Sequence, residues 1–273
     1  MTSTRPPFDS NRAWTQATAA LRANREVVFA LAGVFFLLPS LAMALLYPQP
    51  EPVPGADQAA MMAQAETYYR QTWFIALPLA ALQAAGTLGL LTLLTDRARP
   101  TVGEAIRAGL GALLPYLASQ IIVGMGLAML FLIFAGIAAG AGLPWMAAVF
   151  AVAIGAPVVM RFALTAPVVV IERWRNPLAA LRRAWQLSAG NTWRLLIFFA
   201  LILLAFVIVM SVITGLSGIV LALLLPPAAV VIIKALISSA IGAALVVVLI
   251  ACLAATHAQL AGERPDSIGS TFE

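Results

Sequence analysis

Residues 161–194 read RFALTAPVVVIERWRNPLAALRRAWQLSAGNTWR, and they carry charge and helix punctuation in a chain that is otherwise apolar. Asn176 followed by Pro177 is typical of a helix start, because an Asn side chain caps free N–H groups and Pro fits the first helical position. Gly190 and Asn191 indicate where that helix ends. The stretch therefore predicts a short surface helix between two apolar segments. Its outer side should carry Arg182, Arg183 and Gln186, and its buried side Leu178, Leu181, Trp185 and Ser188.

The composition of the whole chain is that of an integral membrane protein. Hydrophobic residues make up 62% of the 273 positions and charged residues only 10%, and the mean hydropathy is +0.98. Soluble domains are about one quarter charged. Runs of at least about 18 apolar residues recur along the chain and leave little length for a soluble domain. We therefore expect an all-α polytopic protein with one membrane domain.

The apolar segments and the polar residues between them predict six spans arranged as three hairpins. The spans are expected at 27–46, 73–95, 113–139, 145–171, 195–225 and 234–258. A cytoplasmic amphipathic surface helix should precede each hairpin, beginning near Ser10, Thr101 and Asn176, so that the unit repeats three times. This pattern divides the chain into an N-terminal tail and surface helix (1–26), a membrane domain (27–260) and a cytoplasmic tail (261–273).

Two details of the predicted helices rest on single residues. Thr101 and Glu104 have the spacing of a capping box, in which each side chain bonds to the backbone of the other residue. Thr214 to Gly218 offers a break in the long fifth segment, and residues 215–233 would then lie in the outer interface, re-enter the membrane or cross it once more. Glycines such as Gly103, Gly109, Gly111, Gly136 and Gly140 indicate close helix packing.

The orientation follows from the distribution of arginine, since cytoplasmic loops are enriched in Lys and Arg. One side should hold Arg5, Arg12, Arg22, Arg25, Arg97, Arg99, Arg107, Arg173, Arg175, Arg182, Arg183, Arg194 and Arg264. The other side should hold Arg70, Lys234, Glu51, Asp57 and Glu66. We therefore expect a multi-pass protein of the bacterial inner (cytoplasmic) membrane with both termini in the cytoplasm.

Arg161 is the ion that the sequence places deepest in the membrane. It lies about 15 Å from Glu172 along a predicted helix, and an unpaired charge there is costly. Partners are expected among Ser119, Gln120, Thr165, Ser211 and Thr214. Arg161 is either part of a site for an anion or lipid headgroup, or a packing residue bonded to carbonyl groups.

The densest charge cluster is a collar formed by Glu172, Arg173, Arg175, Arg182, Arg183 and Arg194. These arginines either anchor the orientation of the protein, or bind phosphate headgroups or a cytoplasmic partner. Glu172 should pair with one arginine and fix the surface helix against the fourth span.

The sequence contains no recognisable catalytic constellation. It lacks a phosphate-binding loop, an HExxH motif and a GxSxG motif. His257 and Cys252 are its only histidine and cysteine, so neither a His-based zinc cluster nor a disulfide within the chain can form. We therefore expect no enzyme activity, metal or cofactor. The basic charge is not accompanied by a polar nucleic-acid-binding surface, and no nucleic acid is expected as a partner.

One sequence pattern resembles that of a known family. It consists of Arg161, Pro167, Glu172, Ala180, Trp185, Leu187, Gly190, Asn191, Trp193 and Arg194. This pattern is similar to the membrane-domain family of glycerophosphodiester phosphodiesterases and to related uncharacterised bacterial six-span membrane proteins, although Ala184 stands where Ser is frequent. The resemblance implies a helical membrane module alone, because the hydrolase activity of that family resides in a separate soluble domain.

Together these features predict a non-enzymatic inner-membrane protein that acts as a lipid-interacting scaffold or partner subunit. Its partners would be membrane lipids, with anionic headgroups at the cytoplasmic face, and either a protein partner or further copies of the chain. The alternative is a transporter of a lipid or amphipathic solute with a polar site near Arg161. An enclosed cavity reaching Arg161 would favour transport, and a solid helical core would favour the scaffold.

Overall fold

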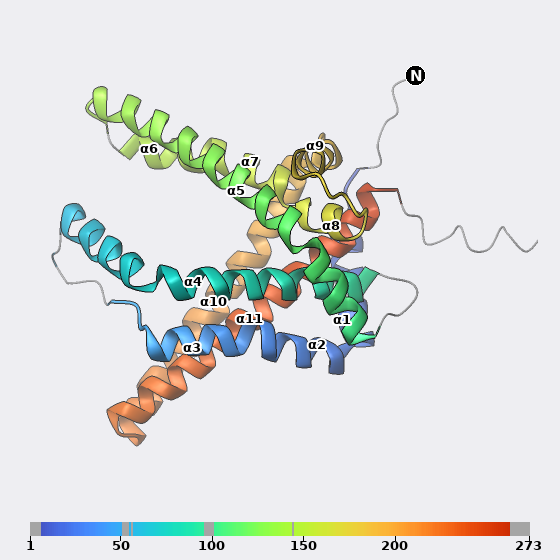
Figure 1. The fold of residues 1–273 in the computed structure, drawn as a ribbon. Helices are drawn as coiled ribbons and strands as arrows, with labels where there is room; N and C mark the ends of the chain where they lie inside the picture. The colour runs from blue at the N-terminus through green and yellow to red at the C-terminus, as the bar shows by residue number, and fades with distance from the viewer. Residues whose placement is uncertain (1–6, 51–54, 56, 96–100, 144, 263–273) are drawn as a thin grey trace, which may run out of the picture.

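The structure is a computed structural model that describes residues 7–50, 55, 57–95, 101–143 and 145–262 (Figure 1). These residues form helices and loops, with no β-strand among them. The elements are α1 (Ser10–Ala23), α2 (Arg25–Ala32), the π-helix η1 (Gly33–Leu37), α3 (Leu38–Leu46), α4 (Gln58–Thr95), α5 (Val102–Gly140), α6 (Trp145–Phe150), the π-helix η2 (Ala151–Gly155), α7 (Ala156–Phe162), α8 (Thr165–Val170), α9 (Pro177–Ser188), α10 (Thr192–Leu224) and α11 (Pro227–Leu260).

Six stretches of this part of the chain are long and apolar enough to cross a membrane. They are Arg25–Leu46, Ala59–Thr95, Val102–Gly140, Trp145–Val170, Thr192–Leu224 and Pro227–Leu260. The predicted class, an all-α chain with six helices able to span a membrane, is therefore confirmed. The outer parts of the predicted tails (1–6 and 263–273) lie outside the described residues, as do Glu51, Arg97 and Arg99.

Two predicted helix ends are wrong. The helix expected after Thr101 does not end before the third span, because α5 continues through Pro115 to Gly140. In an apolar helix a proline produces a kink that neighbouring groups can satisfy, and it need not end the helix. The break expected at Thr214 to Gly218 is also absent, since α10 continues to Leu224. The chain turns instead at Pro226, and α11 begins at Pro227.

Prolines explain the irregular helices of the first and fourth spans. Pro39 and Pro157 each follow a π-helix by two residues, at η1 and η2 respectively. A wider π-turn accommodates a residue that lacks an N–H and whose ring crowds the carbonyl four residues earlier. Pro167 has a stronger effect, since the helix is interrupted at Ala163 and Leu164, the fourth and third residues before it. This interruption separates α7 from α8.

The predicted helix caps are confirmed. Thr101 and Glu104 form both bonds of the capping box. The Asn176 side chain accepts hydrogen bonds from the backbone N–H groups of Leu178 and Ala179. Gly190, with φ of 84°, follows α9 in a backbone conformation that favours glycine. The connection from α8 through α9 into α10 is therefore encoded locally.

Helices α1 and α9, which lie outside the six spans, pack against the bundle through small residues. Ala13 and Ala17 of α1 are buried against α11. The buried face of α9 consists of Ala180, Leu181, Ala184, Leu187 and Ser188. The prediction that Leu178 and Trp185 belong to this face is wrong, because they are 63% and 38% exposed. Small side chains let the α9 backbone approach α7 and α8, and the bulky ones remain at its edge.

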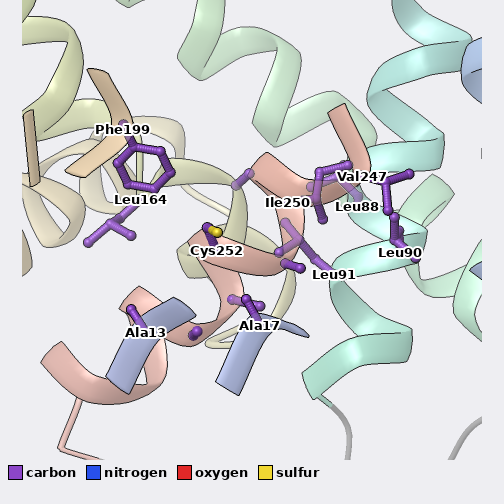
Figure 2. Packing of buried hydrophobic residues seen from close by; sticks show 14 of the residues in the cluster. Ala13, Ala17, Leu88, Leu90, Leu91, Leu164, Phe199, Val247, Ile250 and Cys252 are labelled. Atoms are coloured by element: carbon purple, nitrogen blue, oxygen red, sulfur yellow. The ribbon is translucent and has the colours of Figure 1, made fainter. Parts of the chain in front are cut away.

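The packed core lies toward one end of the bundle. We call this end the basic end, since it holds the exposed side chains of Arg12, Arg107, Arg173, Arg182 and Arg194; the opposite end, with Tyr47, Glu66 and Pro227, is the far end. In Figure 1, α1, α8 and α9 lie where α4, α5 and α11 converge, and the other ends of the hairpins diverge. Figure 2 shows buried Leu88 of α4 near Ile250 of α11, and Cys252 of α11 near Ala17 of α1.

The backbones of α4 and α5 approach each other closely. A Cβ atom on Gly109 would lie 2.7 Å from the backbone nitrogen of Gly89 and 2.9 Å from the carbonyl oxygen of Ala85. Gly109 therefore has the predicted packing role. Gly103, Gly136 and Gly140 do not, because a Cβ there would meet nothing within 4 Å.

Candidate functional site

Glu172 is the centre of a polar cluster at the basic end. It follows α8, whose Val168 and Val169 are fully buried in the core, and so the loop begins from a fixed point. The Glu172 carboxylate accepts hydrogen bonds from Arg183 Nε at 2.8 Å, Trp174 Nε1 at 2.9 Å and His257 Nε2 at 3.0 Å. The predicted pairing of Glu172 with a collar arginine is therefore present.

The hydrogen bonds to Glu172 decide its charge. Burial raises the pKa of this carboxyl, but the bonds from Arg183, His257 and Trp174 together outweigh burial and hold the pKa below its usual value of 4.5. Glu172 is thus ionised at neutral pH. An ionised carboxylate only accepts hydrogen bonds, so His257 Nε2 must carry a proton. Because His257 is 2% exposed, it is shielded from a reactant outside the protein.

A sharp turn brings Trp174 back toward Glu172. Arg173, between them, has a φ of 59°, which lies in the left-handed region that non-glycine residues rarely adopt. This conformation costs about 1 kcal/mol, comparable to the gain from one hydrogen bond to a charged group. The loop, α9 and α11 are thereby joined through one carboxylate, although His257 is 85 residues from Glu172.

Arg161 lies in the last turn of α7, which packs against α9 and α10. Its Nε donates to Thr192 Oγ1 at 3.2 Å, and its guanidinium carbon lies 4.3 Å from the centre of a Trp185 ring. Ser188 Oγ donates to the backbone carbonyl of Arg161 at 3.1 Å. Thr192 is the first residue of α10. Arg161 is therefore held at the level where α10 begins, by a hydroxyl and an aromatic face.

The partners predicted for Arg161 were wrong. Ser119, Thr165 and Thr214 instead donate to carbonyl groups of nearby residues on their own chain segments, and Gln120 donates to the Tyr116 hydroxyl. Ser and Thr in apolar helices commonly bond backward in this way. The actual partners, Trp185 and Thr192, come from α9 and α10.

The collar arginines divide into two groups. Arg183 binds Glu172, and Arg175 donates to the carbonyl of Gly111 at the start of the third span. Arg173, Arg182 and Arg194 are exposed, and they make no ion pair with the described residues. Two of the predicted headgroup-binding residues are thus engaged within the fold, and three remain available to an external anion.

The N-terminal segment is tied to the same end of the bundle, which the sequence did not predict. The backbone N–H of Phe8 donates to Asn191 Oδ1 at 3.0 Å, and the Phe8 ring meets Phe198 with centres 5.4 Å apart. Asp9 and Gln259 exchange hydrogen bonds of 3.3 Å. A terminal segment with one aromatic residue gives no local signal for such contacts; the buried amide of Asn191 also needs its partner.

The contacts of this end hold its own side chains in place. Within the described residues, no group of three or more His, Cys, Asp or Glu could hold a metal ion. Cys252 is fully buried. What the basic end can do is present guanidinium groups, which bind phosphate through paired hydrogen bonds.

The fold and this cluster define a multi-pass α-helical membrane protein with one strongly basic end. Comparison with protein-family models, curated proteins and solved structures found no match to the chain.

Proposed function

We propose that this protein is a non-enzymatic scaffold or partner subunit of the bacterial inner membrane whose basic end binds anionic lipid headgroups. The observation that carries the proposal is that some collar arginines are bonded within the fold and the others are exposed. Glu172 fixes α9 against α11, and Arg173, Arg182 and Arg194 are left exposed on this rigid support. Each such arginine near an anionic surface contributes about 1 kcal/mol to binding.

The orientation of the basic end supports a cytoplasmic location for it. The exposed arginines of α1, α5, α9 and α10 gather at this end, and Arg70 at the far end is paired with Glu66. Positive charge of this kind marks the cytoplasmic side of bacterial membrane proteins. Both termini would then be cytoplasmic, as the sequence predicts.

The α5–α6 hairpin supports a partner or a second copy. Only 6% of the most apolar window is buried inside the chain in the third span, and the same share in the fourth. These surfaces would face lipid or another helix. Close packing with a partner is favoured at glycines, and Gly124, Gly126 and Gly136 of α5 have open space beside them.

The rival function, transport through a polar site at Arg161, has less support. The Arg161 side chain is engaged by Thr192 and Trp185. A cleft of about 630 Å³ does exist, but it opens between α3, α4, α10 and α11 and is not lined by Arg161. The resemblance of the WQLSAGNTWR segment to the membrane-domain family supports a module of that kind and carries no hydrolase activity with it.

Replacing Arg161 with Gln tests the scaffold against the transporter. If Arg161 is structural, Arg161→Gln lowers the free energy of unfolding by about 1–2 kcal/mol, through loss of its cation–π contact and its charged hydrogen bond. The folded variant should retain as much anionic phospholipid as the wild type. Unfolding of the purified protein in mild detergent gives the free energy of unfolding, and native mass spectrometry gives the amount of retained phospholipid.

Arg107→Gln is the matched control, because Arg107 is an exposed arginine at the same end with no described ion pair. This variant should unfold like the wild type. A fully stable Arg161→Gln protein that retains less lipid, or that abolishes a lipid flux measured across vesicles, would contradict the scaffold and favour transport.

A further inference from the structure

A cleft at the far end is lined by polar side chains that are not part of the basic end. It has a volume of about 630 Å³ and lies between α3, α4, α10 and α11. Its walls include the apolar side chains of Met43, Leu79 and Val231, together with Lys234 and Gln83. Polar side chains in spanning helices are expensive, and they face cavities or binding sites rather than lipid tails.

Ser40, Tyr47 and Gln49 also line this cleft, and Lys234 and Gln83 are two of its hydrogen-bond donors. Neither side chain makes a hydrogen bond or ion pair with the described residues. The Lys234 ammonium leans toward α10, where it lies 3.8 Å from the place of a Cβ on Gly218, so that this glycine leaves room for it. Lys234 is exposed, and an unpaired ammonium group at the membrane surface attracts anionic headgroups.

The hydroxyl groups of Thr214 and Ser238 do not pair with Lys234. Thr214 Oγ1 donates to the Met210 carbonyl, and Ser238 Oγ donates to the Ala235 carbonyl. The nearby acidic residue Glu66 is paired with Arg70 instead. The cleft therefore offers one positive charge and an amide donor without a carboxylate among its lining residues.

The height of Lys234 fits a lipid phosphate. Lys234 is 26 residues before the end of α11 at Leu260, which is about 39 Å of helix at 1.5 Å per residue. That length exceeds the hydrocarbon core of about 30 Å and reaches the headgroup region on the far side. The apolar wall formed by Met43 and Leu79 continues into the hydrocarbon level, where an acyl chain would lie.

We propose that this cleft binds one anionic phospholipid from the far leaflet. Its phosphate pairs with Lys234, Gln83 donates to a further lipid oxygen, and an acyl chain lies along Met43, Leu79 and Val231. This site is separate from the arginines of the basic end, which it does not require. A free inorganic anion would use Lys234 but leave the apolar wall uncovered.

The test uses a cysteine introduced as Ser238→Cys in the full chain, in mild detergent. Native Cys252 is 0% exposed and should not react. Short-chain phosphatidylglycerol should slow modification of the new cysteine by a small thiol reagent. Phosphatidylcholine of the same chain length should need about tenfold higher concentration, since it brings no net charge to Lys234. Inorganic phosphate should give no protection.

Further variants assign this protection to Lys234. Adding Lys234→Gln should weaken protection by phosphatidylglycerol about tenfold, to the level of phosphatidylcholine. Lys234→Arg should retain it. Arg70→Gln removes a far-end cation outside the cleft and should change nothing. Equal protection by the two lipids, protection by inorganic phosphate, or full protection in Lys234→Gln would each overturn the proposal and leave the basic end unaffected.

Discussion

The Glu172 carboxylate receives donors from Trp174 in its own loop, Arg183 of α9 and His257 of α11. Its side chain is 18% exposed, and that of His257 is 2% exposed. When a partly buried carboxylate is neutralised, the donors around it lose a charged acceptor but cannot all turn to water. The three segments therefore depend on this one charge for their relative position.

Neutralising Glu172 should destabilise the basic end. We expect Glu172→Gln to lower the free energy of unfolding by about 1–3 kcal/mol at neutral pH, given the partial exposure of the Arg183 pair. The folded-state pKa of Glu172 is lowered, so its contribution is complete above its unfolded value, near 4.5. That contribution is lost as pH falls through the lower folded-state pKa. Unfolding curves measured between pH 3 and 7 should show this loss.

The Glu172→Gln protein should lack that acid-dependent loss, so the stability of the wild type should fall toward that of the variant as pH falls. Arg182→Gln is the control, because Arg182 lies next to Arg183 but is exposed and unpaired among the described residues. It should leave both stability and pH dependence unchanged. Equal stability of Glu172→Gln and wild type at pH 7 would show that the cluster does not hold the fold together.

Sequence reasoning found part of this site. Clustered charge identified Glu172 and an arginine partner. It could not find His257 or Thr192, because these residues reach the cluster through the packing of whole helices and have no periodic signal. A lone histidine near the end of the last span and a lone acid in the collar were available as a clue. Their meeting depends on the packing of α8 and α9 against α11.

At the scale of elements, α4 and α5 form the most extensive helix pair of the bundle. Their backbones meet where Gly109 faces Gly89 and Ala85, with no space for a methyl group. Such an approach maximises contact between helices in a lipid environment, where no hydrophobic effect draws them together. This crossing sets the position of the start of α5 and hence of Gly111, which receives the bond from Arg175.

Gly109→Ala should separate these helices. A methyl group 2.7 Å from a backbone nitrogen forces the backbone to move, and we expect a loss of about 2–4 kcal/mol in unfolding free energy, in the range of overpacked and strained sites. Gly103→Ala on the same helix meets nothing within 4 Å. It should be neutral or stabilise by up to about 1 kcal/mol. Similar unfolding curves for the two variants would contradict the close crossing.

Local chemistry predicted the element boundaries where a cap or a turn residue defines them. The capping box at Thr101, the cap at Asn176 and the turn at Gly190 are all present. The break at Thr214 to Gly218 was predicted from small and hydroxylated residues. These residues keep their N–H groups, so they can stay within a helix in apolar surroundings, whereas Pro226 and Pro227 end it.

The whole molecule has a packed basic end and diverging hairpins toward the far end (Figure 1). Apolar content predicted the six spans. It could not predict this asymmetry, because an apolar residue that faces lipid and one that faces another helix look the same in the sequence. The packed end gives the exposed arginines a rigid support. The divergent end leaves apolar faces and a cleft that lipids or another chain can occupy.

The central claim is that Arg173, Arg182 and Arg194 bind anionic headgroups, and native mass spectrometry of the delipidated protein titrated with phosphatidylglycerol tests it most directly. Replacing all three with Gln should weaken the binding of phosphatidylglycerol at the basic end by about 100-fold, at about 1 kcal/mol for each arginine, and should leave the single lipid of the cleft in place. Replacing all three with Lys should preserve most of the binding. Unchanged binding by a correctly folded triple Gln variant would contradict the account.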